Sequence, residues 1–314
     1  MEEKESLLSK IGVNYTDATY ITNPAIARDE EIKQMILVLL TPDKSPILVG
    51  KPGIGKTAIV EGLAYNILRG TVPEKLKTYD VVKINVASML GNIIVNGEEV
   101  TKLSLIVEEL MELKKTILFI DEIHTLIGNG ENEGLDFANM LKPAIDRGSI
   151  KLIGATTTEE YERYLVRDRA FIRRFEKIDV EEPNVATTVK IVLGTLPKIE
   201  DKTGVKFKYS LFEVEQIIKF LVNATTEYKR VFELSNRFPD IALALTAKAF
   251  SFAVFDNKKE VSIKHVYQAI LDSKSIYPDV IKKELLAFRK EFKDIIDDES
   301  IEFLEDIDNT EILG

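Results

Sequence analysis

The chain has 314 residues, of which 45% are apolar and 30% charged, a balance typical of a soluble globular protein with one large or two ordinary domains. The absence of cysteine excludes disulfides, a thiol nucleophile and a cysteine metal site, and the two histidines, His124 and His265, lie too far apart in sequence to suggest a zinc site. The net charge of −10 argues against broad nucleic-acid binding. No apolar run approaches the about 18 residues of a membrane span, and the acidic N-terminus lacks a signal region. The cytosol is therefore the expected compartment.

Residues 1–28 are expected to form a short helix and an extended arm, broken at Asn23-Pro24. An amphipathic helix follows from Arg28 to Leu40. Apolar runs then alternate with helical patterns, which indicates an α/β fold with a parallel sheet covered by helices. The expected strands are 46–50, 81–86, 116–121, 150–156 and 175–180. The helices expected between them are 56–69, 98–115, 134–147 and 158–169.

The pattern becomes mostly helical after Pro183. The helices expected there are 184–200, 210–223, 239–255, 263–272 and 278–293, with one short strand at 261–263. We therefore expect four parts, which are an arm (1–28), a large α/β domain (29–182), a small helical domain (183–293) and an acidic tail (294–314). A solvated tail is favoured over a docking peptide for the last part.

The segment Gly50-Lys-Pro-Gly-Ile-Gly-Lys-Thr57 lies between an apolar run and a helical pattern. This is the context of a phosphate-binding loop, in which glycines let backbone N–H groups face phosphate oxygens and the helix start adds its positive end. Lys56 would reach the β- and γ-phosphates, and the Thr57 hydroxyl would bind Mg²⁺. The alternative, a plain glycine-rich turn, leaves the Gly-Lys-Thr sequence unexplained.

A second segment, Thr116-Ile-Leu-Phe-Ile-Asp-Glu122, is an apolar strand that ends in two carboxylates. At such sites the aspartate, here Asp121, holds magnesium, and Glu122 would polarise the attacking water as general base. A buried strand that simply emerges into solvent is the alternative, and the phosphate loop upstream favours the site. His124 is expected to pack or cap rather than to bind a metal.

These segments make the chain resemble the AAA+ ATPases, and more narrowly the first ATPase module of the Clp-type ring chaperones and unfoldases. The blocks that carry the resemblance are Ile26–Ile32, Val49–Ala64, Leu118–Leu126, Asn139–Pro143, Arg147-Gly148, Gly154–Thr157 and Arg173–Phe175. The resemblance implies a P-loop AAA+ large domain with a small, mostly helical C-terminal lid domain. It also implies ATP and Mg²⁺ as cofactors, ATP hydrolysis, and a ring of identical subunits, most often a hexamer.

The same resemblance implies roles for further residues. Thr157 matches the sensor that orients water and detects the γ-phosphate, although it would equally cap the next helix. Arg173 and Arg174 match arginine fingers that act on the site of a neighbouring subunit and have no role in their own, and a solvated basic pair is the alternative. The residues that match nucleotide-binding positions are Ala25, Ile26 and Pro239 around the adenine, and Pro52, Gly53, Ile54, Gly55 and Ala58 in the phosphate loop.

The chain departs from the family at the channel loop that grips a threaded polypeptide. In a gapless alignment the loop is Ile93-Ile-Val-Asn-Gly-Glu98, with Val95 where the family has an aromatic residue, so we expect a weak grip. Only one ATPase module is present, and the loop that docks a protease belongs to the second, so no protease partner is expected. A ring-forming protein remodeller is therefore expected. An ATP-gated assembly module that threads nothing is the alternative, and a DNA-handling role is disfavoured by the charge.

Overall fold

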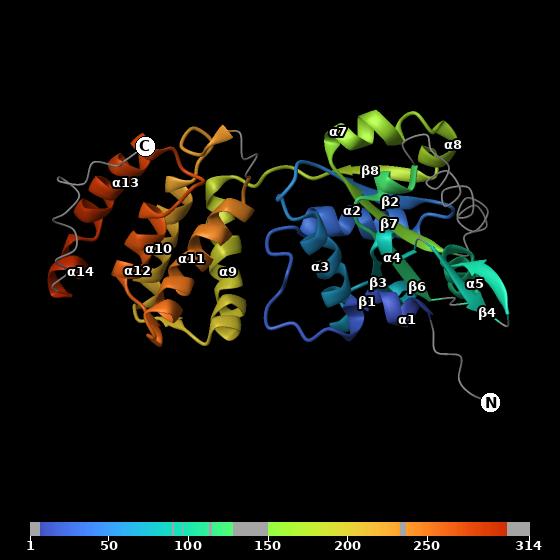
Figure 1. Cartoon of the computed structure of the whole chain (residues 1–314), viewed down its shortest axis with the longest axis horizontal. Coiled ribbons are helices and arrows are strands. Elements are labelled where there is room, and N and C mark those ends of the chain that lie inside the picture. The colour runs from blue at the N-terminus through green and yellow to red at the C-terminus, as the bar shows by residue number, and fades with distance from the viewer. Residues whose placement is uncertain are drawn as a thin grey trace. The chain divides into compact units, whose positions relative to one another are not determined.

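The computed structural model describes residues 7–89, 91–95, 97–112, 115–127, 150–232 and 237–299. The chain divides into two compact units, Met1–Glu182 and Pro183–Gly314, and each unit is described by itself (Figure 1). The helix expected at 134–147 and the family-like blocks between 139 and 148 lie outside the described residues. The boundaries of the lid domain and the tail within the second unit stay predictions.

The large unit is built on a six-stranded sheet in the order β1-β3-β6-β7-β2-β8, parallel except for β1 at its edge. Its strands are β1 (Gly12–Asn14), β2 (Ser45–Val49), β3 (Asp80–Ile84), β6 (Thr116–Ile120), β7 (Lys151–Thr156) and β8 (Phe175–Asp179). The five parallel strands confirm the expected ones. The first strand was missed, so part of the expected arm is an edge strand that pairs with β3.

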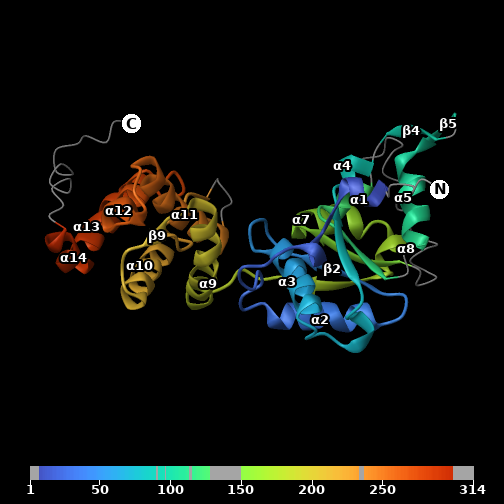
Figure 2. The ribbon, with the colours of Figure 1, turned by 90° about the horizontal axis from the view of Figure 1, so that it is seen from below.

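Helices cover both faces of this sheet (Figure 2). One face carries α2 (Asp29–Leu40) and α3 (Lys56–Leu68). The other carries α1 (Leu7–Ile11), α4 (Val86–Met89), α5 (Lys102–Glu112) and α8 (Arg169–Ile172). Successive side chains of β6 alternate between the two cores, with Phe119 on the α3 side and Leu118 on the α5 side. The central strands are therefore buried on both faces, which explains their continuous apolar sequences.

The strands β6, β7 and β2 are direct neighbours and run in the same direction. Their carboxyl ends therefore meet at one edge of the sheet, where ligands bind in open α/β folds. The phosphate loop follows β2, the two carboxylates follow β6, and Thr157 follows β7. The topology alone brings these three segments together.

Two expected helices of the large unit are wrong in part. The stretch 98–115 begins as a strand, because β4 (Asn92–Val95) and β5 (Glu98–Thr101) form an antiparallel hairpin before α5. Ile94 lies opposite Glu99 in this hairpin, and its side chain is 78% exposed. The stretch 158–169 is broken into α7 (Thr158–Glu160) and a π-helical turn at Tyr161–Leu165. Short 3-10 turns occupy Tyr15–Asp17, Glu74–Leu76 and Ile123–Ile127.

The small unit is mostly helical, as expected. Its elements are α9 (Val185–Thr203), β9 (Lys206–Phe207), α10 (Leu211–Ala224), α11 (Asp240–Phe255), β10 (Glu260–Val261), α12 (Ile263–Leu271), α13 (Pro278–Glu291) and α14 (Lys293–Asp298). The expected acidic tail is not solvated at its start, since Ile296 packs into the core and Glu299 accepts a hydrogen bond from the Tyr209 hydroxyl. Among the described residues of both units, no helix has the length and apolar character needed to cross a membrane.

Candidate active site

The phosphate loop, residues 50–55, depends on glycines at defined positions. Gly53 and Gly55 have φ angles of 74° and 98°, in the left-handed region that other residues rarely adopt. A Cβ atom on Gly50 would lie 2.3 Å from the carbonyl oxygen of Val180 in the strand pair beside it. The loop therefore has the tight backbone turns that a phosphate loop requires, and phosphate binding by it stays a prediction. Of its other residues, Pro52 is exposed and Ile54 is buried.

Lys56 is the first residue of α3, and its side chain folds back into the loop. The residue is buried, and its Nζ donates hydrogen bonds to the carbonyl oxygens of Gly50 at 2.8 Å and Lys51 at 3.1 Å. Burial lowers the pKa of Lys56, while the nearby carboxylates of Glu122 and Asp121 raise it. A cation is thus held inside a ring of backbone groups, where an anionic phosphate would neutralise it.

Thr57 and Asp121 supply the oxygens that a magnesium ion prefers. The Thr57 hydroxyl donates to Asp121 Oδ2 at 3.1 Å. Two oxygens bound side by side to Mg²⁺ at its usual distance would lie about 2.9 Å apart, so the pair fits the ion. Lys83, which the sequence analysis missed, places its Nζ 3.0 Å from the same carboxylate oxygen. Its strand β3 neighbours β6, and that register was the available signal.

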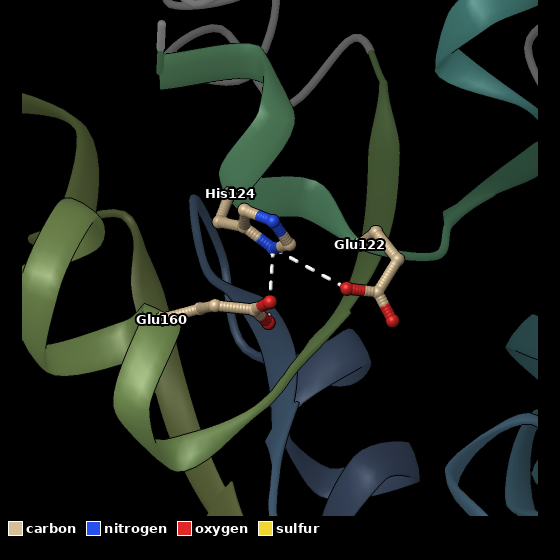
Figure 3. A group of neighbouring side chains, drawn as sticks. All are labelled: Glu122, His124 and Glu160. Atoms are coloured by element: carbon tan, nitrogen blue, oxygen red, sulfur yellow. Dashed lines mark ion pairs between the residues drawn. The ribbon is translucent and has the colours of Figure 1, made fainter. Parts of the chain in front are cut away.

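Glu122 lies beside two further polar side chains, as Figure 3 shows. The Nδ1 atom of His124 is 3.4 Å from Glu122 Oε2 and 3.2 Å from Glu160 Oε2. Glu122 has a φ angle of 53°, so the chain turns sharply where β6 ends. This turn exposes about half of the Glu122 side chain and leaves its carboxylate accessible at the sheet edge.

The pKa of Glu122 is raised, first by burial of its carboxyl group and then by the negative charges of Glu160 and Asp121, while Lys56 lowers it. A carboxylate with a raised pKa is a stronger base, which suits a group that must take a proton from water. The pKa of Glu160 is lowered, because hydrogen bonds from Thr157 and Thr156 and the nearby His124 outweigh its burial. The two carboxyl groups therefore have different properties at the same site.

Thr157 begins α7 and takes part in its capping box. Its Oγ1 donates to Glu160 Oε2 at 2.7 Å, and its backbone N–H donates to the same oxygen at 3.1 Å. The helix-capping alternative for Thr157 is therefore present in the structure, and the sensor role stays a prediction. The hydroxyl of the preceding residue, Thr156, faces His124 Nδ1 at 3.1 Å.

Ligand atoms of Glu122, His124 and Glu160 lie within 4.8 Å of one another and could hold a metal ion. The Glu160 oxygen, however, already accepts the hydrogen bonds of the capping box. The helix cap therefore accounts for this arrangement, and Thr57 with Asp121 remains the better magnesium site.

Arg28, also missed by the sequence analysis, ties the loop to the rest of the large unit. Its side chain is buried, and Nη2 donates to the carbonyl oxygen of Ile54 at 2.7 Å. Both terminal nitrogens lie 3.2 Å from the carbonyl oxygen of Glu181, and Nη1 pairs with Glu31 at 2.7 Å. One cation thus connects the start of α2, the phosphate loop and the end of the large unit.

Arg173 and Arg174 do not lie at their own phosphate loop. The backbone carbonyl of Arg174 accepts a hydrogen bond from Ser45, the first residue of β2, whereas the loop follows the last residue of that strand. Arg174 is buried and donates to the carbonyl oxygen of Ala170, so it has contacts in its own subunit, contrary to expectation. Arg173 is exposed; its backbone carbonyl accepts a hydrogen bond from Lys44, and its backbone N–H donates to the carbonyl oxygen of Arg169.

The expected adenine contacts belong to two units. Ala25 is buried against α3, where a Cβ on Gly62 would lie 2.3 Å from the Ala25 Cβ, and Ile26 is half-buried next to it. Pro239 precedes α11 in the small unit. The segment at Ala25 therefore lies next to the helix that starts at the phosphate loop, and the contribution of Pro239 stays a prediction.

Residues 46–179, which include the loop, the two carboxylates and the arginine pair, match the family model described as "ATPase family associated with various cellular activities (AAA)". This chain carries an AAA ATPase domain. The family model describes ATPases, and its match covers the phosphate loop and both carboxylates.

The AAA chain is similar to larger proteins of the Clp type. It is 40% identical to the chaperone protein ClpB of Aquifex aeolicus over 77% of its length and 24% of that protein. It is 39% identical to the ATP-dependent Clp protease ATP-binding subunit ClpE of Bacillus subtilis over 80% of its length and 35% of that protein. Both relatives are much longer than this chain.

Solved structures of Saccharomyces cerevisiae Hsp104 are also similar. The Hsp104:casein complex in an extended conformation matches with a TM-score of 0.69 and 33% identity, over 85% of this chain and 47% of that one. The Hsp104-ADP complex matches with a TM-score of 0.67 and 33% identity, over 95% and 48%. The AAA chain thus spans at most about half the length of these relatives.

Proposed function

We propose that this protein is a magnesium-dependent ATP hydrolase that assembles into a ring, most simply a homohexamer, and remodels other proteins. The observation that carries the ATPase part is the convergence of Lys56, the Thr57–Asp121 pair and Glu122 at the carboxyl ends of β2 and β6, which flank β7. These residues supply a cation for the phosphates, two oxygen ligands for magnesium and a carboxylate base, and the similarity to AAA and Clp-type proteins supports the assignment.

The chain's own residues divide the work of hydrolysis. The loop amides and Lys56 would hold the β- and γ-phosphates, and Thr57 and Asp121 would hold Mg²⁺, which supplies charge neutralisation at the phosphate oxygens. Glu122 Oε1, the carboxylate oxygen not in contact with His124, would take the proton of the attacking water. Thr157 would orient that water from the end of β7.

The ring follows from the arginine pair. The strand β2 separates Arg173 from its own phosphate loop, and an arginine side chain is too short to span a strand of five residues. Arg173 is exposed and would therefore act on the site of a neighbouring subunit, where it would stabilise charge on the transferred phosphoryl group. A ring of identical subunits gives every site such a neighbour.

A protein substrate is proposed from the relatives, one of which was solved as a complex with casein and one of which is named a chaperone. The β4–β5 hairpin contains the segment that the sequence resemblance matches to the family's channel loop, and it presents Ile94 to solvent. The second candidate function is an ATP-gated assembly module that does not thread polypeptide. The observation that favours it is the lack of an aromatic residue in this hairpin. A cytosolic location stays part of the proposal.

The test is a pair of substitutions. Glu122→Gln keeps the shape of the side chain but cannot take a proton, so it should bind ATP normally and turn over orders of magnitude more slowly. Lys56→Ala should instead weaken nucleotide binding. Wild-type turnover by Glu122→Gln would refute the catalytic assignment. Stimulation of ATP turnover by unfolded casein would support remodelling, and nucleotide-dependent assembly without stimulation would support the assembly module.

A further inference from the structure

The two carboxyl groups at the active site are linked by His124, whose position the proposed mechanism does not use. Its Nδ1 atom is surrounded by Thr156 Oγ1 at 3.1 Å, Glu160 Oε2 at 3.2 Å and Glu122 Oε2 at 3.4 Å (Figure 3). The imidazole ring stacks on Tyr164 with centroids 5.8 Å apart, which fixes its plane. The side chain is 15% exposed, so these contacts are only partly replaceable by water.

The tautomer of His124 follows from its neighbours. The Thr156 hydroxyl donates its proton to Glu160 Oε2 at 3.2 Å, so its oxygen faces His124 as an acceptor. Glu160 and Glu122 present carboxylate oxygens. Since all three partners are acceptors, Nδ1 must carry the hydrogen and act as donor.

Glu160 is itself held in place by the backbone. The capping box at the start of α7 fixes its Oε2 through the N–H and hydroxyl of Thr157. His124 is therefore anchored on one side to the end of β7 and on the other side touches the base. The base, in contrast, follows a sharp turn and is about half exposed, so contacts from its neighbours Glu160 and His124 orient its carboxylate.

We propose that His124 is a positioning residue for ATP hydrolysis, whose Nδ1 contacts Glu122 Oε2 and thereby aims the other oxygen of that carboxylate at the attacking water. This inference rests on the proposed ATPase function with Glu122 as base. His124 also connects Glu122 to the end of β7 at Thr156 and Thr157. A contact between this strand end and a phosphate would therefore change the orientation of the Glu122 carboxylate. A carboxylate that loses its orientation loses a large part of its effect, because general-base catalysis requires hydrogen-bond geometry to the water.

Two substitutions separate the donor from the ring. His124→Phe keeps the stacking on Tyr164 but has no donor. His124→Asn loses the ring, yet its amide nitrogen lies where Nδ1 was and can donate to the same oxygens. Tyr164→Leu serves as the matched control, because it removes the stacking and leaves the donor. All three are assayed as full-length protein for kcat and KM of ATP hydrolysis, with thermal unfolding measured in parallel.

We expect His124→Phe to lower kcat by about 10- to 100-fold with less than about a threefold change in KM, the range expected for a misaligned catalytic group. His124→Asn should retain kcat within about threefold of wild type, and so should Tyr164→Leu despite a lower unfolding temperature. An unchanged or faster His124→Phe would overturn the inference, and so would equal losses in all three variants, which indicate a packing role. A wild-type protein without turnover, or a fully active Glu122→Gln, would instead refute the proposed function on which the inference rests.

Discussion

Replacing Arg28 with methionine should weaken nucleotide binding, because the guanidinium holds the carbonyl of Ile54 inside the phosphate loop. Methionine fills much of the volume of the arginine stem but donates nothing, so the buried carbonyl of Ile54 and the part-buried carbonyl of Glu181 lose this donor. Hydrogen bonds to charged groups contribute about 1.5–3 kcal/mol each. If the bond to Ile54 holds the loop in its binding conformation, its loss alone corresponds to a dissociation constant about 10- to 150-fold higher.

The same substitution should destabilise the large unit. The two carbonyl contacts together amount to roughly 3–6 kcal/mol before relaxation, and the loss of the largely buried pair with Glu31 adds to this. Arg28→Lys keeps one charge but cannot reach both carbonyls, so we expect an intermediate effect. Lys33→Met is the matched control on the same helix, since its ion pair with Glu30 is exposed on both sides and should contribute almost nothing.

The assay is the dissociation constant of a fluorescent ATP analogue, measured in the Glu122→Gln background to prevent turnover, together with urea unfolding of each variant. We expect the order wild type and Lys33→Met, then Arg28→Lys, then Arg28→Met. If Arg28→Met binds the analogue as tightly as wild type and unfolds at the same urea concentration, the structural argument is wrong. Lower stability with unchanged binding would show that Arg28 supports the fold but not the loop.

Three further outcomes follow from the structure. Arg173→Ala should lower ATP turnover about 1,000-fold or more without loss of stability. Mixing Arg173→Ala subunits with subunits that lack the catalytic base should restore some activity. Arg174→Ala, at a buried position, should also lower the unfolding temperature. Turnover by a dilute monomer would contradict this role in trans. Burial lowers the pKa of His265 below its ordinary 6.5, so the contribution of His265 to folding stability is complete above that pH and declines as the pH falls below it. His265→Gln keeps the helix cap without titrating and should therefore lose less stability than wild type between pH 7.5 and 5.5. Equal losses would exclude His265 as the origin of the pH dependence. In the hairpin, Ile94→Tyr should improve ATP-driven unfolding of a tagged fluorescent reporter more than Val95→Tyr does. The reverse order would support Val95 as the gripping residue, as the gapless alignment has it.

The phosphate loop and the two carboxylates could be predicted because each is a continuous segment. Their local sequences determine a strand, a turn and a helix, and parallel topology brings the strand ends together without further information. Arg28 could not be found this way, because its partners are backbone carbonyls 26 and 153 residues away. A carbonyl acceptor leaves no trace in residue identity, so no local pattern identifies the arginine that binds it. The contact of Lys83 with Asp121 depends likewise on strand order.

The arginine pair shows how neighbours in sequence acquire different roles. Arg173 and Arg174 are identical in type and adjacent, so the sequence treats them alike. At the end of a short helix, consecutive side chains point in different directions, and here one direction leads into the core and the other into solvent. The buried Arg174 is held by the carbonyl of Ala170 in the preceding helix α8, whereas Arg173 is exposed, as its proposed role in a neighbouring subunit requires.

The hairpin depends on the same kind of geometry. The segment Val95-Asn-Gly97 carries the Asn-Gly pair typical of a two-residue turn, flanked by β-branched residues, but the glutamates that follow favour a helix and the turn was overlooked. Cross-strand pairing then decides which side chains face outward, because a shift of one residue reverses the face. A sequence alignment without gaps assigns the gripping position to Val95. The strand register instead pairs Ile94 with Glu99 and leaves Ile94 exposed, so under the proposed remodelling function we expect Ile94 to contact the polypeptide.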